Sequence, residues 1–284
     1  MSLVGSALVG LVCSPACGDT LSMFMPTALR STTAISLLFG ALLALSPTPA
    51  PAAQSCVSEE FEGARYSVCT IETADDLQLF WDDAEGAPYR SFSAVSNALE
   101  AEGWTLRFAV NAGMYDTNFR PLGLYIEDGA QKVRISTANP GQNTQPVPNF
   151  LKKPNGVFYV DRDGTAGILS TEAYVEAALE PRIATQSGPM LVIDGEFHPM
   201  LIPGSTDRTP RSGVGVCENG AVRFAVSDGR VNFHDFARLF RDHLGCSNAL
   251  FLDGGRGVGL HSPDLGRNDF SWHGGYGPMF GVVD

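Results

Sequence analysis

Apolar and polar residues alternate over several short runs of this chain, and four pairs of runs are separated by an Asp-Gly or Asn-Gly dipeptide. Alternation of period two is typical of half-buried strands, and these dipeptides favour tight hairpin turns. The pattern therefore predicts four hairpins: Gly123–Ile126 with Gln131–Ile135, Gly156–Val160 with Ala166–Leu169, Met190–Ile193 with Phe197–Met200, and Val214–Cys217 with Val222–Ser227. Further strands are expected at Tyr66–Ile71, Leu77–Trp81, Thr105–Val110 and Ala249–Leu252.

Three segments repeat their apolar positions at helical spacing, namely residues 91–101, 171–179 and 232–244. The last is the clearest, because Asn232 is a favourable N-cap and Gly245 follows the final apolar position. Local strand pairs with few helices predict the α+β class. We expect a mixed, largely antiparallel β-sheet core with a few covering helices, in a single domain.

The first fifty-odd residues resemble a secretory leader. Arg30 precedes an apolar run, Ala34–Leu45, which is too short to span a bilayer comfortably, and Ser46–Ala53 offers small residues for cleavage after Ala52 or Ala53. An uncleaved N-terminal anchor is the alternative interpretation.

We therefore assign residues 1–53 to a leader with its start at Met23 or Met25, and residues 54–284 to the domain. This assignment predicts a secreted or periplasmic protein with no stable membrane span after processing.

Four cysteines belong to the predicted domain, Cys56, Cys69, Cys217 and Cys246, and they allow three connectivities. The pairs Cys56–Cys69 and Cys217–Cys246 are favoured, because the two cysteines of each pair are close in sequence and flank predicted structure. Neither the cysteines nor the five histidines show the spacing of a metal site, so no cofactor or metal is expected. The formal net charge of −12 argues against a nucleic-acid partner.

The strongest candidate chemistry lies where the apolar run Ala249–Leu252 ends in Asp253, Gly254, Gly255 and Arg256. The end of a strand holds a side chain rigidly, and paired glycines let a ligand approach the backbone. An ordinary strand-to-turn Asp-Gly is the alternative.

Other polar residues lie beside glycines upstream. Asn111, Gly113 and Asp116 follow a predicted strand, where a simple Asx-turn is the alternative. Asn155, Gln186 and Ser187 are candidates for hydrogen bonds to ligand hydroxyls, although Ser187 can equally begin a turn.

Arg211 is a candidate for planar, bidentate contacts with a phosphate or carboxylate. A structural salt bridge is the alternative for this side chain, and Arg208 is a candidate helper.

Seven motifs in order resemble the phosphodiester glycosidase family, particularly its short secreted bacterial branch, over residues 66–284. They are NAGMYD (111–116), PLGLY (121–125), KPNGVFY (153–159), ATQSGPMLVIDGEFHP (184–199), RSGVGV (211–216), VNFHDFARLFRDHLGC (231–246) and LFLDGG (250–255). The family's first element falls on Asn111, Gly113 and Tyr115, with Ala112 departing from it. After Gly255 the family usually continues with serines, whereas this chain has Arg256-Gly257-Val258-Gly259.

The resemblance implies hydrolysis of a sugar-1-phosphodiester on a glycan or cell-envelope component. Arg211, helped by Arg208 or Arg256, would hold the phosphate, and Asp253 would act as nucleophile or water-activating base. Asn111, Asn155, Gln186 and Ser187 would contact sugar hydroxyls. Two alternatives stay open: a non-catalytic periplasmic binder of sugar phosphate or cell-wall polymer, and a metal-assisted phosphodiesterase.

Overall fold

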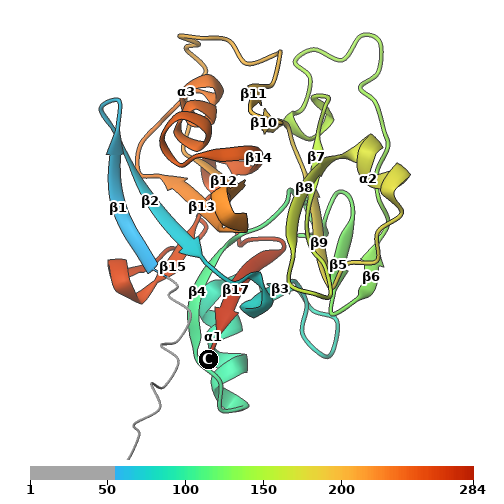
Figure 1. The fold of residues 1–284 in the computed structure, drawn as a ribbon. Helices are drawn as coiled ribbons and strands as arrows, with labels where there is room; N and C mark the ends of the chain where they lie inside the picture. Colours follow the sequence, from blue (N-terminus) through green and yellow to red (C-terminus); the bar gives the residue numbers. More distant parts are fainter. Residues whose placement is uncertain (1–54) are drawn as a thin grey trace, which may run out of the picture. The chain divides into compact units, whose positions relative to one another are not determined.

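Antiparallel pairing builds three sheets in the computed structural model, which describes residues 55–284 (Figure 1). The leader predicted for residues 1–53 lies outside the described residues. The seven-stranded first sheet has the order β1-β2-β13-β12-β14-β10-β11. Its strands are β1 (Ser55–Phe61), β2 (Ala64–Ile71), β13 (Val222–Ser227), β12 (Arg211–Cys217), β14 (Cys246–Gly254), β10 (Met190–Ile193) and β11 (Glu196–Phe197).

The other two sheets have five strands each. The second has the order β16 (Arg267–Asn268), β15 (Leu260–Ser262), β4 (Leu106–Asn111), β17 (Met279–Val283) and β3 (Leu77–Phe80). The third has the order β6 (Ala130–Val133), β5 (Tyr125–Glu127), β9 (Ile183–Ser187), β7 (Gly156–Val160) and β8 (Ala166–Ser170).

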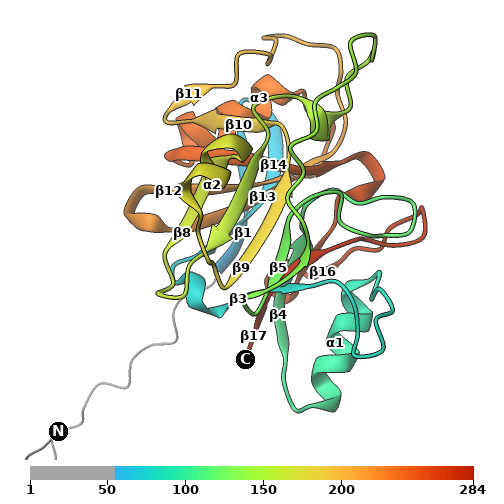
Figure 2. The same cartoon turned by 90° about the vertical axis from the view of Figure 1, so that its right-hand side faces the viewer.

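Each sheet is covered by one helix, and Figure 2 shows α1 beside β4, away from α3. The helices of the described residues are α1 (Phe92–Ala101), α2 (Thr171–Ala177) and α3 (Phe233–Arg238), which continues into a π-helical segment, Leu239–His243. The apolar stripe predicted for residues 232–244 is buried along both α3 and the π-helical segment. None of these helices has the length and apolar character needed to cross a bilayer.

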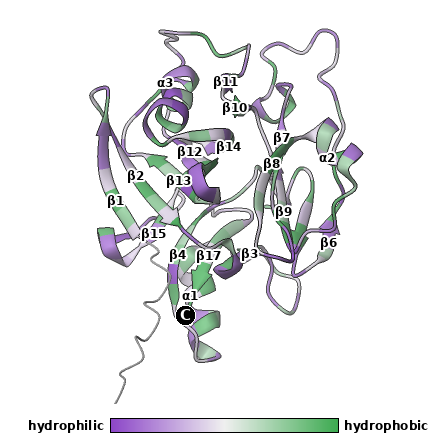
Figure 3. Ribbon diagram, viewed as in Figure 1, coloured by the Kyte–Doolittle hydropathy of each residue, from purple (hydrophilic) through white to green (hydrophobic). Residues whose placement is uncertain are grey.

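The inner faces of the three sheets share one apolar core. Phe224 of the first sheet packs on Phe108 and Phe280 of the second and on Phe158 of the third. Alternate residues point the other way, toward the covering helices, so strands such as β14 are apolar on both faces. Figure 3 shows the apolar positions along these strands.

The α+β class, the antiparallel pairing and all four hairpins are confirmed. The short strands β1, β9, β15, β16 and β17 were not expected. Gln186 and Ser187 lie in β9, paired with β7, and Ser187 is the last residue of that strand, directly before a bend at Gly188. Most of these strands pair with strands that are distant in sequence. Their alternation of apolar and polar residues is therefore a weak signal in the sequence.

Both favoured disulfides are present, Cys56–Cys69 and Cys217–Cys246. Each joins residues directly opposite one another, on β1 and β2 and on β12 and β14. The strand pairing therefore places the two cysteines of each disulfide next to one another.

Replacing Cys217 and Cys246 together by serine should lower the free energy of unfolding by about 3 kcal/mol, since the bridge closes a loop of 29 residues. Urea denaturation of the oxidised proteins measures the loss. The matched change at Cys56 and Cys69, whose separation is 13 residues, should cost slightly less. An unchanged denaturation midpoint for both double variants would contradict this expectation.

Candidate functional site

Four strand ends from the three sheets meet at one place, which we call the strand-end junction. It comprises Asn111 at the end of β4, Ser187 at the end of β9, Ser212 near the start of β12 and Asp253 near the end of β14. Ser187 Oγ donates to the carbonyl of Leu252 at 2.8 Å, and Asn111 Nδ2 donates to Ser212 Oγ at 2.8 Å. These contacts connect the three sheets beside the Asp253 carboxyl group.

Asp253 is half-buried, and its Oδ1 accepts a hydrogen bond from the Gly254 N–H at 2.7 Å. Burial raises the pKa of this carboxyl to about 7, although the Gly254 hydrogen bond opposes the shift. A Cβ on Gly257 would overlap the carboxylate, so only glycine leaves the observed space for Oδ2. Asp253 can therefore exchange a proton near neutral pH from a closely confined position.

Asn111 acts on Asp253 through Ser212. Its side chain is 1% exposed, and its Oδ1 accepts the Gly259 N–H at 3.2 Å. Ser212 Oγ contacts the backbone of Asp253 twice, donating to the carbonyl at 3.2 Å and accepting from the N–H at 3.3 Å. In this geometry Asn111 positions the end of β14 through Ser212. The sequence analysis had predicted that Asn111 contacts the substrate directly.

Tyr115 connects the junction to an exposed loop. Its Oη donates to the Gly275 carbonyl at 3.1 Å and lies 2.8 Å from His273 Nε2. Its pKa is raised by burial and then by the negative charge of Asp253. His273 Nδ1 lies 2.6 Å from Ser271 Oγ. No sequence motif indicated His273 or Ser271, because their relation to Tyr115 is formed only by the fold.

Two buried hydroxyls near the junction lack a hydrogen-bond partner in residues 55–284, Thr185 Oγ1 and Tyr276 Oη. Gly113 packs so closely on β9 that a Cβ there would overlap Thr185 Oγ1. Tyr276 Oη approaches Gly259 in the same way. Unsatisfied buried hydroxyls are rare, and a buried water molecule can satisfy such groups.

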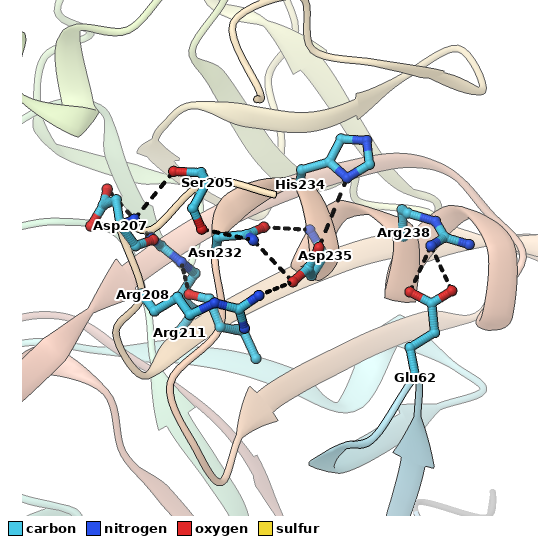
Figure 4. Close-up of polar contacts among 10 residues, drawn as sticks. Glu62, Ser205, Asp207, Arg208, Arg211, Asn232, His234, Asp235 and Arg238 are labelled. Atoms are coloured by element: carbon cyan, nitrogen blue, oxygen red, sulfur yellow. Dashed lines mark hydrogen bonds and ion pairs between the residues drawn. The ribbon is translucent and has the colours of Figure 1, made fainter. Parts of the chain in front are cut away.

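The Arg211 side chain leaves the strand on the opposite face from Ser212, since adjacent residues of a strand point to opposite sides. Its guanidinium lies 3.5 Å from the ring centre of Phe233, and its Nε donates to the Val231 carbonyl at 2.9 Å. Nη2 donates to the Asp207 carbonyl at 3.2 Å (Figure 4). Burial lowers the pKa of Arg211 to about 10, so the group stays charged at neutral pH.

Arg211 therefore does not converge with Asp253. It is 1% exposed, and it lies opposite Gly254 rather than Asp253 in the sheet register. The sequence predicted that the Arg211 guanidinium contacts a phosphate. In the structure it instead forms its hydrogen bonds and its ring contact with groups of the protein. Arg208 forms an exposed ion pair with Asp235 at 2.9 Å (Figure 4).

Gln186 and Asn155 are also occupied by protein partners, contrary to the expectation that they face a sugar. Gln186 Oε1 accepts the N–H groups of Leu124 and Ser136, and its Nε2 donates to Ser136 and Thr171. Asn155 bonds the Phe150 carbonyl and the Thr171 hydroxyl. Both amides are buried and hold loops around the third sheet.

Asp116 closes a turn, because its Oδ1 accepts the N–H groups of Asn118 and Arg120. This is the Asx-turn that was the alternative for this residue.

Gly254, Gly255 and Arg256 continue from Asp253 toward open solvent. The Gly255 N–H donates to the Pro210 carbonyl at 2.9 Å, and Gly255 has the positive φ of 64° that glycine adopts without strain. Arg256 is exposed and lines a groove of about 820 Å³ together with Gly255. Of the three predicted arginines, this one is exposed and has no ion pair with another of residues 55–284.

The part of the chain that the structure describes shows no set of side chains arranged to bind a metal ion. Residues 55–284 contain no group of three or more His, Cys, Asp or Glu side chains that could hold an ion. The junction instead offers one carboxyl, hydroxyls, backbone N–H groups and a nearby guanidinium.

The comparisons with known proteins agree with this architecture. The family model for phosphodiester glycosidases matches residues 105–274. Uncharacterized protein YigE of Escherichia coli strain K12 is 33% identical over 212 residues, which are 75% of this chain and 80% of that relative. The auto-inhibited catalytic domain of zebrafish N-acetylglucosamine-1-phosphodiester alpha-N-acetylglucosaminidase shares the fold with a TM-score of 0.54 at 15% identity, covering 83% of this chain and 84% of that one. The chain belongs to the phosphodiester glycosidase family.

Proposed function

We propose that this chain is a secreted or periplasmic glycosidase that hydrolyses the bond between a sugar and a phosphodiester on a glycan. The observation that carries the proposal is the Asp253 carboxyl, with a pKa of about 7, confined at the strand-end junction by the close approach of Gly257. Family membership supplies the reaction class. The two disulfides support an oxidising compartment outside the cytoplasm.

A phosphodiester leaving group is a weak base, so protonating it contributes little to the reaction. One carboxylate therefore suffices where ordinary glycosidases use two. Asp253, when ionised, attacks the anomeric carbon or activates a water molecule there. Arg256 stabilises the negative phosphate, which replaces the role first expected for Arg211. Tyr115, which is partly exposed, is the group available for sugar hydroxyls.

An assay that measures free sugar and p-nitrophenolate separately tests this function. The first probe is the p-nitrophenyl phosphodiester of N-acetylglucosamine-1-phosphate, chosen from the sugar named for the zebrafish neighbour, followed by glucose and mannose analogues. Release of free sugar, unaffected by chelator, supports the proposal. Saturable binding of every probe without release would favour a non-catalytic binder, the alternative suggested by Arg256–Gly259 replacing the family's serines. Cleavage on the other side of the phosphate, lost with chelator, would indicate a metal-assisted phosphodiesterase.

The Gly257→Ala variant should lose about 10²-fold in kcat, because the new methyl group displaces the Asp253 carboxylate from its reactive position. The overlapping atoms belong to the end of a side chain, so the fold should accommodate the change. Turnover and thermal unfolding measure the two effects separately. Gly229→Ala is the matched control, since a Cβ at Gly229 meets no atom within 4 Å. Equal activity in the two variants would exclude a confined carboxylate as a requirement.

A further inference from the structure

Two neighbouring aromatic side chains are exposed at the groove that Gly255 and Arg256 line. Trp272 is 80% exposed and Phe270 is 59% exposed, and their ring centres lie 4.4 Å apart. Both residues line the groove of about 820 Å³, a volume within the range that holds small ligands. Paired exposed aromatic rings in a concave site are typical of a binding surface.

The loop that carries these rings is tied to the strand-end junction at both ends of the Trp272 segment. Ser271 Oγ donates to the Arg256 carbonyl at 3.3 Å, and His273 contacts the Tyr115 hydroxyl at 2.8 Å. Gly255 and Arg256, the second and third residues after Asp253, form part of the groove wall. The groove wall therefore begins two residues along the chain from Asp253 and continues to Trp272.

The groove carries an excess of positive charge, whereas the whole chain has a net charge of −12. Three arginines line it, and one of them, Arg267, is neutralised by Asp228 and Asp269. The side chains of Arg65 and Arg256 have no ion pair or hydrogen bond within residues 55–284. These two guanidinium groups are therefore available to an anion such as a phosphate.

The rest of the lining is polar and includes Ser58, Ser67 and Asn268. A lipid would require a continuous apolar wall, and the net charge opposes a nucleic acid. A sugar ring fits both parts of the groove, because its C–H face packs on an aromatic ring while its hydroxyls form hydrogen bonds at the edges.

We propose that this groove is a subsite for the glycan on the phosphate side of the cleaved bond. One sugar ring stacks on Trp272 and Phe270, and Arg256 and Arg65 contact the phosphate between this ring and the sugar at Asp253. The inference rests on the proposed function, because it names the part of that substrate which the groove holds. The preferred substrate is then an oligosaccharide phosphodiester rather than a small ester.

Two substrates test the subsite, both N-acetylglucosamine-1-phosphodiesters, one with a methyl group and one with maltotriose on the other side of the phosphate. The measured quantity is the ratio of kcat/KM for the maltotriose ester to kcat/KM for the methyl ester. Trp272→Ala should lower this ratio about tenfold, the effect of one lost stacking contact of about 1.4 kcal/mol. Trp272→Phe should restore most of it.

Trp104→Ala is the matched control, because Trp104 is 53% exposed and does not line the groove. Its ratio should equal that of the wild type. A ratio in Trp272→Ala that also equals the wild-type value would overturn the subsite.

A binding measurement separates failure of the subsite from failure of the proposed function. The maltotriose ester is added to the Trp104→Ala protein, and acrylamide quenching of tryptophan fluorescence reports the shielding of Trp272. Shielding without hydrolysis of either ester would retain the subsite and reject the glycosidase. Hydrolysis without shielding would reject the subsite alone, and the absence of both would reject the two together.

Discussion

The Asp253→Asn variant is expected to lose about 10³-fold or more in turnover of the sugar-1-phosphodiester, while the protein stays folded. The amide oxygen can still accept the Gly254 hydrogen bond, so the local geometry is retained. An amide can neither attack the anomeric carbon nor accept a proton from water. Steady-state assays at substrate concentrations above and below KM measure the loss.

The pH dependence of the wild type should follow the same carboxyl. A base must be ionised to act, so kcat/KM should rise with pH through about 7 and then level off. Asp264→Asn, which changes an exposed carboxylate, is the control for turnover and should retain it. A variant of Asp253 with wild-type turnover, or a wild-type profile without an inflection near neutrality, would remove Asp253 from the mechanism.

Stability should respond in the opposite direction from activity. The pKa of Asp253 rises from 3.8 to about 7 on folding, so the folded protein holds the extra proton between these values. The free energy of unfolding of the wild type therefore decreases as the pH rises from 3.8 to about 7. Asp253→Asn has no titrating carboxyl at this position and lacks that decrease. Because the side chain is only half-buried, we expect a gain of about 1–2 kcal/mol for Asp253→Asn at pH 8. Thermal unfolding at pH 8 and pH 4 measures it, with no difference expected at the lower pH.

The Arg211→Met variant should lose about 4 kcal/mol of folding stability. The change removes the cation–π contact with Phe233 and leaves the buried Val231 carbonyl without its charged donor. Urea denaturation followed by circular dichroism measures the loss. Turnover per folded molecule should change far less than in Asp253→Asn, because the guanidinium lies on the other face of the sheet.

Arg208→Met is the matched control, since Arg208 forms only an exposed ion pair with Asp235. Its cost should stay below about 1 kcal/mol. If Arg211→Met instead kept its stability and raised KM for phosphodiesters strongly, Arg211 would be a phosphate ligand after all, and the loop at Asp207 would have to open for substrate.

Local chemistry was sufficient to predict much of the fold. The Asp-Gly and Asn-Gly turns identified the hairpins, and Asn232 and Gly245 marked the ends of one helix. The short separation of the cysteines in sequence predicted the disulfide pairs. Each of these features depends on residues that are close in sequence. β9 and β17 were missed because most of their partners lie far away along the chain.

The candidate site shows the same division. The sequence singled out Asp253 and Asn111 and the Ser212-containing motif, but it assigned similar contacts to Arg211, Gln186 and Asn155. Only the tertiary structure showed that Ser212 faces Asp253 while its neighbour Arg211 faces Phe233.

The sequence by itself determined the turns, the helix ends, the cysteine pairs and the family, because these depend on the identity and order of nearby residues. The tertiary structure decided which polar side chains meet. Sheet pairing and packing between distant strands choose the face on which each side chain lies and whether protein groups already satisfy it. For that physical reason Asp253 remains available at the strand-end junction, whereas the equally prominent Arg211 is enclosed on the opposite face.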